Sequence, residues 1–209
     1  MNDIKVMGCL KPTYNKSLIL SRLGYDKHRT AISNESLRGI GRLITYAENT
    51  LSIMATYRII DISYIDSPRV VLEDGTILSG KKLSELLKNS RQALVMGATG
   101  GAKIMELIEQ LQVEGKMSDA VVIDAAASEI TDSALDFVMS IVGQYLKPRG
   151  KFLTKMRFSP GYGDFEITQQ KDFYRLLEAQ NLGIKLNEAC LLIPEKSVFA
   201  IAGICGEKE

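Results

Sequence analysis

The nine residues RFSPGYGDF, at positions 157–165, combine a cation with turn-forming residues that could hold a small charged ligand. Arg157 offers a planar guanidinium that can bind a carboxylate through two hydrogen bonds. Pro160 favours an extended conformation in the preceding residue, and Gly161 permits backbone angles that other residues resist. Tyr162 adds a flat aromatic face with a hydroxyl at its edge. The segment therefore predicts either a ligand-binding turn or an ordinary Pro-Gly turn beside a surface arginine.

A second polar pattern lies in DAAASEITD, at positions 124–132. In a helix, Asp124, Ser128 and Asp132 would stand one turn apart on the same side. Such a side could be an acidic ligand face. It could equally be a solvated helix face whose acidic residues complement the helix dipole. The pattern alone leaves both interpretations open.

A glycine cluster, MGATGGAKI at positions 96–104, follows an expected strand and opens an expected helix, which is where phosphate-binding glycines occur. Its GxxGG spacing matches neither the dinucleotide fingerprint nor the P-loop. The glycines could instead allow close packing between strand and helix. A nucleotide-dependent enzyme centred on this cluster is one hypothesis, and close packing is the other.

The overall composition indicates a globular chain without a charge bias. The 209 residues are 45% hydrophobic and 24% charged, enough for a sizeable core. The 26 basic and 25 acidic side chains nearly cancel, so we expect neither nucleic acid nor a membrane as a partner. No run of about 18 apolar residues occurs, and Asp3 and Lys5 interrupt the first apolar residues. We therefore expect no membrane span and no signal peptide.

The cysteines and the histidine form no metal or nucleophile motif. Cys9, Cys190 and Cys205 are widely spaced and lack a CxxC pair, and the single His28 cannot complete the usual zinc ligand sets. We expect the cysteines to be small core residues in a reduced cytoplasm, and His28 to lie in a solvated loop. One histidine also gives no basis for a Ser/His/Asp triad.

Hydrophobic periodicity predicts strands in both halves of the chain. Residues 56–65 alternate apolar and polar side chains, as a half-buried strand does, and residues 92–99 are typical of a buried strand. EDGT, at 73–76, is typical of a turn. Two later apolar segments, 183–193 and 197–204, are separated only by Pro-Glu-Lys. This short connection favours an antiparallel pair between them.

Helices are predicted where apolar residues recur every three or four positions. Ser79 and Gly80 precede the first helix as a cap, and the apolar run 120–124 is followed by the third helix, which ends between Gly143 and Gly150. The apolar stripes of the four helices are Leu83, Leu86 and Leu87; Ile104, Leu107, Ile108 and Leu111; Ile130, Ala134, Phe137, Val138 and Ile141; and Phe173, Leu176 and Leu177.

The C-terminal half carries a family resemblance. RFSPGYGDFEITQQKDFYRLL, followed by GIKLNEACLLIPEKSVFAIAGI, resembles the activation domain of vitamin B12-dependent methionine synthase, whose signature is an RxxPGY turn. LSGKKLSELL, ALVMGATGGAKIMELI and AVVIDAAASEITD are similar to the stand-alone subunit form of that domain. The resemblance implies one activation-type domain over residues 1–209, clearest over 57–204 and weakly assigned over 1–56. The implied fold is α+β, a C-shaped single domain in which helices flank a mostly antiparallel sheet.

The same resemblance implies a role in methionine biosynthesis, as part of a methyltransferase system. Domains of this family bind S-adenosylmethionine and reactivate methionine synthase whose cobalamin has been oxidised to cob(II)alamin. An electron donor such as flavodoxin supplies one electron, and reductive methylation traps the reduced cobalt as methylcobalamin. This chain has no DxHxxG corrinoid loop and no zinc-binding cysteine set. It is therefore expected to act in the cytoplasm on a corrinoid-binding partner subunit, without being catalytic alone.

The resemblance also assigns site residues. Arg157 is expected to meet the carboxylate of S-adenosylmethionine, with Ser159, Gly161 and Tyr162 forming the binding turn. Asp132 stands where the family usually has a glutamate, and is expected to meet the ligand's ammonium or ribose. Tyr162 is our candidate for the ring that lies against the reacting methyl group. The alternatives are an S-adenosylmethionine-binding interaction module, or an activator of another corrinoid methyltransferase.

Overall fold

The computed structural model describes residues 3–25 and 32–206, so the expectation for His28 lies outside the described residues. Within these ranges, a seven-stranded sheet has the order β4-β3-β2-β5-β9-β6, with β1 added beside β2, and β7 and β8 form a separate pair. Every pair is antiparallel. The strands are β1 (Lys5–Met7), β2 (Met54–Asp66), β3 (Arg69–Leu72), β4 (Ile77–Ser79), β5 (Gln92–Thr99), β6 (Phe152–Leu153), β7 (Lys185–Leu186), β8 (Leu192–Ile193) and β9 (Ser197–Cys205).

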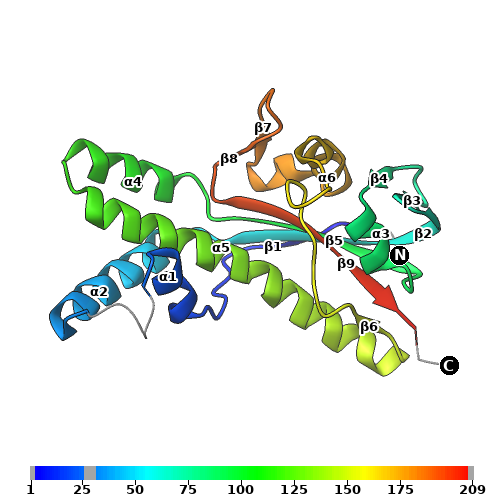
Figure 1. Ribbon diagram of the computed structural model, residues 1–209, viewed down its shortest axis with the longest axis horizontal. Coiled ribbons are helices and arrows are strands. Elements are labelled where there is room, and N and C mark those ends of the chain that lie inside the picture. Colours follow the sequence, from blue (N-terminus) through cyan, green and yellow to red (C-terminus); the bar gives the residue numbers. More distant parts are fainter. Residues whose placement is uncertain (1–2, 26–31, 207–209) are drawn as a thin grey trace.

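Helices flank both faces of the sheet, and the longest, α5, crosses the whole molecule (Figure 1). The α-helices are α1 (Lys16–Arg22), α2 (Asn34–Thr50), α3 (Lys81–Leu87), α4 (Lys103–Val113), α5 (Met117–Leu146) and α6 (Gln170–Leu176). Three short 3-10 helices span Lys147–Arg149, Ile167–Gln169 and Ala179–Leu182. None of the helices in the described ranges is both long and apolar enough to cross a membrane.

The central strands agree with the sequence patterns. The predicted strand at 56–65 lies within β2, and the one at 92–99 coincides with β5. The predicted turn at 73–76 joins β3 to β4, and Gly75 occupies it with a φ of 83°. Adjacent residues of β5 point to opposite faces, as strand geometry requires. Leu94 therefore packs in the core beneath α5, whereas Val95 packs in the second core on the other face.

The predicted pairing of the two C-terminal segments with each other is wrong. The first segment folds on itself, because Cys190 donates its amide to the Asn187 carbonyl in a tight turn between β7 and β8. The second segment is β9, which pairs with β5 along one edge and with β6 along the other. Both edges of β9 are therefore used by other strands, and the connection through Pro194 joins two different sheets.

The four predicted helices are present as α3, α4, α5 and α6, but the third begins earlier than predicted. The apolar run 120–124 does not precede the third helix but lies inside it, because α5 begins at Met117. Its residues continue the apolar stripe, and Ala120 and Ile123 are both buried. The helix gives way to a 3-10 turn that ends at Gly150, which takes a left-handed conformation with a φ of 63°.

The cysteines only partly match the expected core positions. Cys190 is buried, Cys205 is partly buried and Cys9 is exposed, so the expectation is wrong for Cys9. All three are free thiols. Cys9 follows β1 at the sheet edge, where the backbone bends outward with a positive φ of 54°.

Candidate functional site

The RFSPGYGDF segment is a loop anchored at both ends. Phe158 and Ile201 of β9 exchange two backbone hydrogen bonds of 2.9 Å, which fix the start of the loop against the sheet. Phe165 is fully buried and stacks against Phe158 with ring centroids 5.9 Å apart. Between these anchors, Gly161 has the positive φ that the sequence indicated and donates its amide to the Phe165 carbonyl at 2.7 Å. The loop between the two rings is therefore a defined turn.

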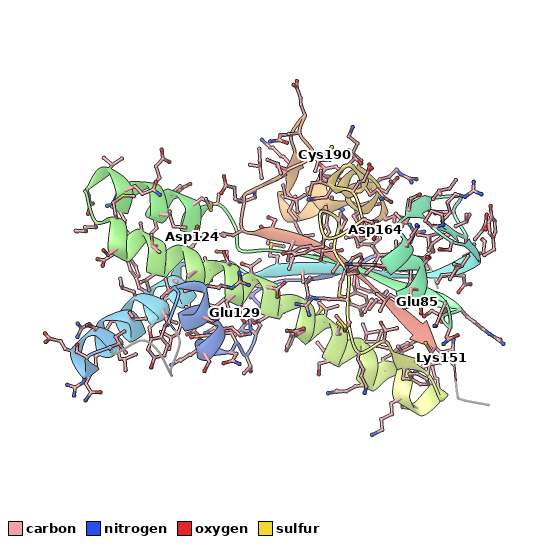
Figure 2. All side chains as sticks on the ribbon, in the orientation of Figure 1. Glu85, Asp124, Glu129, Lys151, Asp164 and Cys190 are labelled. Carbon is pink, nitrogen blue, oxygen red and sulfur yellow. The ribbon has the colours of Figure 1, made fainter. Side chains whose placement is uncertain are left out.

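Asp164 fastens the same loop to helix α3. The predicted Ser-Gly cap of α3 is incomplete, since Gly80 at the cap position has no side chain. The carboxylate of Asp164 accepts hydrogen bonds from the amides of Lys81 at 2.6 Å and Lys82 at 3.4 Å instead. Figure 2 shows Asp164 beside α3. Desolvation acts to raise the pKa of Asp164, but these backbone hydrogen bonds and the charge of Lys82 outweigh it and lower the pKa.

Arg157 connects the loop to helix α5. One terminal nitrogen, Nη2, lies 2.8 Å from Oδ2 of Asp132, and the other, Nη1, is bonded to Oδ1 of Asp136. The side chain of Arg157 is only 19% exposed, so this fork is largely enclosed. The structure thus brings the predicted residues Arg157 and Asp132 together. They form an ion pair with each other, whereas the sequence analysis expected each to meet a different group of the ligand. Asp136 was missed, although it stands one helical turn beyond Asp132.

A second cation is paired with Asp124, at the other end of the acidic side of α5. Lys196, just before β9, lies 2.6 Å from Oδ1 of Asp124 and donates to the Ser128 hydroxyl at 3.0 Å. Its side chain is 10% exposed. Asp124, Ser128 and Asp132 do share one side of α5, as predicted. Because two cations from distant segments pair with that side, it is not simply a solvated helix face.

A hollow of about 170 Å³ opens between these two ion pairs, and we call it the central hollow. Of the predicted residues, Asp132 and Tyr162 line it, and the Tyr162 side is open because that residue is 67% exposed. Ser159, Gly161 and Arg157 are not among the described residues that line it. Its lining residues are Arg22, Ser128, Thr131, Asp132, Tyr162, Glu195, Lys196, Ser197 and Val198.

Gly100 of the glycine cluster packs beneath this hollow, whereas Gly97 packs in the second core on the other face of the sheet. A Cβ atom on Gly100 would lie 2.9 Å from the Thr131 hydroxyl and 2.6 Å from a methyl group of Leu51. In β5, a Cβ atom on Gly97 would lie 2.7 Å from the ring of Phe199. Gly100 therefore allows close packing against α5, as one of the two hypotheses for the cluster predicted, while Gly97 allows it against the neighbouring strand β9.

Thr131 lines the hollow, but its hydroxyl lies toward Gly100 and has almost no accessible surface. The residue is 2% exposed, and its hydroxyl has no hydrogen-bond partner among the described residues. A buried hydroxyl without a partner is costly. Thr131 was missed from the sequence, because threonine within an apolar helix pattern gives no distinctive signal.

A buried ion pair borders the hollow on the side of α1. Glu129 of α5 is 5% exposed, and its Oε2 lies 3.2 Å from Nε of Arg22, the last residue of α1. Figure 2 shows Glu129 next to α1. No sequence pattern indicated this pair, since the two residues are 107 positions apart. Across the described residues, no group of three potential metal ligands occurs.

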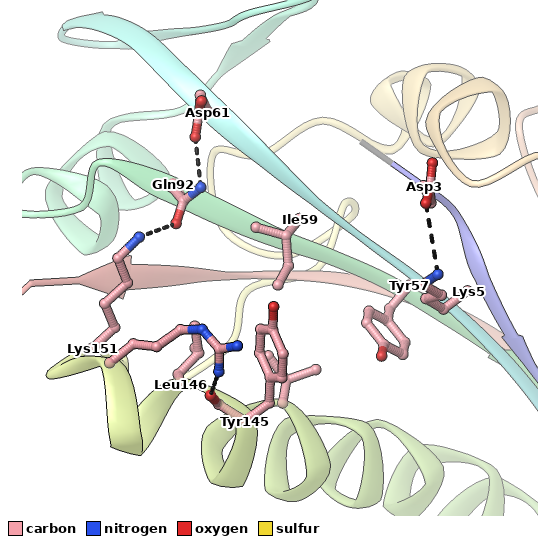
Figure 3. A pocket seen from close by; sticks show the side chains of 11 residues that line it. Asp3, Lys5, Tyr57, Ile59, Asp61, Gln92, Tyr145, Leu146 and Lys151 are labelled. Carbon is pink, nitrogen blue, oxygen red and sulfur yellow. Dashed lines mark hydrogen bonds and ion pairs between the residues drawn. The ribbon is translucent and has the colours of Figure 1, made fainter. Parts of the chain in front are cut away.

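A larger hollow, of about 280 Å³, lies at the other end of α5, and we call it the end hollow (Figure 3). Gln92 donates to Asp61 at 2.6 Å and accepts from Lys151 at 2.8 Å. The guanidinium of Arg149 covers the ring of Tyr145 at 3.8 Å. The residues that line it, which include none of the predicted site residues, are Asp3, Lys5, Tyr57, Ile59, Asp61, Gln92, Val142, Tyr145, Leu146, Arg149 and Lys151.

Comparison with known proteins identifies the fold. No protein-family model matches this sequence, and no curated protein matches it either. Among solved structures, the MetH reactivation domain bound to AdoHcy is similar over 100% of this chain and 80% of its own, with a TM-score of 0.74 and 13% sequence identity. The chain therefore has the fold of that reactivation domain. The resemblance inferred from the sequence, with its α+β fold class, is confirmed at the level of the fold.

Proposed function

We propose that this protein binds S-adenosylmethionine in the central hollow and serves as an activation subunit for cobalamin-dependent methionine synthase. One observation carries the proposal: Asp132 and Tyr162, both expected at such a site, line the same hollow on this fold. The solved neighbour of that fold is a reactivation domain bound to AdoHcy, the demethylated form of the proposed ligand.

The chemistry of the hollow fits this ligand. S-adenosylmethionine carries an ammonium, a sulfonium and a carboxylate, and the lining of the hollow offers carboxylates from Asp132 and Glu195 and cations from Arg22 and Lys196. The open aromatic face of Tyr162 can attract a sulfonium.

The predicted residues take two kinds of role in this proposal. Asp132 and Tyr162 line the hollow and would contact the ligand, the carboxylate meeting the ammonium. Arg157 fixes the position of Asp132, while Ser159 and Gly161 set the turn that carries Tyr162. All five remain our candidates for S-adenosylmethionine binding. Asp132 and Tyr162 would act by direct contact, and the other three would act by holding these two in place.

Cobalamin, held by a corrinoid-binding partner, would accept the methyl group once a donor such as flavodoxin has supplied an electron. The residues of this chain would bind and orient S-adenosylmethionine and exclude water from the open side of the hollow. Tyr162 is exposed enough to lie between the ligand and a docked partner. No step in this role needs a metal or a base from the chain itself.

Ligand-induced stabilisation tests the binding proposal. Thermal unfolding should be measured with S-adenosylmethionine, S-adenosylhomocysteine and NAD in parallel. A ligand at a hundred times its dissociation constant stabilises the fold by about 2.7 kcal/mol. We expect a rise in Tm with the two sulfur ligands and none with NAD. A well-folded protein that responds to neither sulfur ligand would contradict the proposal.

The corrin absorption spectrum tests the activation role. With a cob(II)alamin-loaded partner, an electron donor and S-adenosylmethionine, the protein should promote formation of methylcobalamin. Tyr162→Ala should slow this methylation more than it weakens ligand binding. Binding without any methylation would instead favour the interaction module. Methylation of a small thiol without a corrinoid would indicate an ordinary methyltransferase.

A further inference from the structure

Glu129 is a buried carboxylate whose position within an apolar core has to be explained. It is 5% exposed, and its carboxylate meets Nε of Arg22 at 3.2 Å. A buried charge is costly unless it is paired. The Arg22 side chain is 47% exposed, so the pair joins an enclosed anion to a cation that reaches the surface of the central hollow.

Helix α1 is held so that Arg22 points to that hollow. Asn15 caps its first turn by accepting the amide of Ser17 at 2.9 Å. Ile19 is fully buried in the core that α5 shares with the sheet. With one side of this short helix fixed by Ile19 and its end fixed by Glu129, the guanidinium of Arg22 has a defined place.

The cations around the central hollow differ in how many of their donors are already used. Arg157 gives both terminal nitrogens to Asp132 and Asp136. Lys196 is bound by Asp124 and Ser128. Arg22 uses only Nε, and among the described residues its two terminal nitrogens have no partner. Two parallel donors are the arrangement that a carboxylate binds best.

We infer that Arg22, rather than Arg157, binds the carboxylate of the ligand in the central hollow, and that Glu129 is a positioning residue for it. This inference rests on the proposed function and specifies it further. Arg22 lines the central hollow, whereas Arg157 is not among the described residues that do. Arg157 then holds Asp132 in place, so the two arginines have different tasks.

The test compares S-adenosylmethionine with its decarboxylated analogue, which lacks only the carboxylate, by calorimetry. The wild-type protein should prefer S-adenosylmethionine by about 10- to 100-fold, the range for one charge-assisted contact. Arg22→Ala should abolish this preference by weakening S-adenosylmethionine alone. Arg157→Ala should weaken both ligands and keep the preference. Arg42→Ala, an exposed arginine of α2, is the matched control and should change neither affinity.

Glu129→Gln tests the positioning role. The amide keeps the shape of the side chain but cannot hold a guanidinium as an ion partner, so the preference for S-adenosylmethionine should fall while the decarboxylated analogue binds as before. Thermal unfolding without ligand would show separately how far the fold is weakened. If Glu129→Gln only lowers Tm and leaves the preference intact, Glu129 has a structural role alone.

The outcomes separate this inference from the proposed function. If neither ligand binds to the wild-type protein, both are wrong. If both bind equally well, the proposed function stands and no residue recognises the carboxylate. If Arg157→Ala abolishes the preference and Arg22→Ala keeps it, the carboxylate belongs to Arg157 and this inference is overturned.

Discussion

The central hollow and the end hollow both lie along α5, but their charged side chains are held in different ways. Around the central hollow, the cations Arg22, Arg157 and Lys196 come from three distant segments, and each is paired with an acidic residue of α5. Around the end hollow, Asp61 and Lys151 are linked through the neutral side chain of Gln92, and Arg149, just after α5, donates to the Tyr145 carbonyl.

This difference indicates which hollow is built for a ligand. The end hollow is larger, at about 280 Å³ against about 170 Å³, yet its side-chain hydrogen bonds are exposed or only partly buried. Exposed ion pairs contribute little and need no special purpose. The central hollow is lined by Arg22, whose guanidinium is paired with an enclosed anion, Glu129. Convergent and partly buried polar groups, more than volume, are typical of binding sites.

The largest expected contrast between the hollows comes from one substitution in each. Asp132→Asn removes a charge that faces the central hollow, and we expect S-adenosylmethionine to bind about 10- to 100-fold more weakly, as for a lost charge-assisted contact. Asp61→Asn, the matched change in the end hollow, should leave the affinity unchanged. Calorimetry measures both. A loss of binding in Asp61→Asn with none in Asp132→Asn would reverse the assignment.

The sequence predicted the elements better than their contacts. Periodicity located β5 and placed Asp124 and Asp132 on one helix side, because both features depend on residues close in the chain. The pairing of β9 with β5 and β6 could not be inferred this way, since it depends on which sheet edges are free. The same limit applies to the contact between Glu129 and Arg22, because these residues are 107 positions apart in the chain.

A smaller effect should follow from filling the space beneath the central hollow. In Gly100→Ala, the new methyl group would press on Leu51 and on the Thr131 hydroxyl. Overpacking of this kind costs about 1–3 kcal/mol of unfolding free energy. Gly41→Ala is the control, because its Cβ would meet nothing within 4 Å in helix α2 and should be neutral or stabilising. Denaturant unfolding distinguishes the two variants, and equal stabilities would show that the packing beneath the site is loose.

The smallest expected effect is a loss of folding stability at low pH, and it involves the loop that borders the central hollow. The pKa of Asp164 is lowered from its ordinary value of 3.8, because the amides of Lys81 and Lys82 bind the ionised carboxylate. A group with a lowered folded-state pKa contributes stability above its unfolded pKa and loses it as the pH falls through the folded pKa. We therefore expect the hold of the loop on α3 to weaken only below about pH 4.

Asp164→Asn isolates this effect, because asparagine can still accept the amide hydrogen bonds but does not titrate. Stability measured by denaturant unfolding between pH 5 and pH 3 should fall less steeply in the variant than in the wild type. Asp61→Asn again serves as the comparison, since that carboxylate belongs to the end hollow and accepts its hydrogen bond from Gln92. If both variants flatten the acid dependence equally, the loss of stability in acid is a general charge effect, and the loop beside the central hollow is not specifically secured by Asp164.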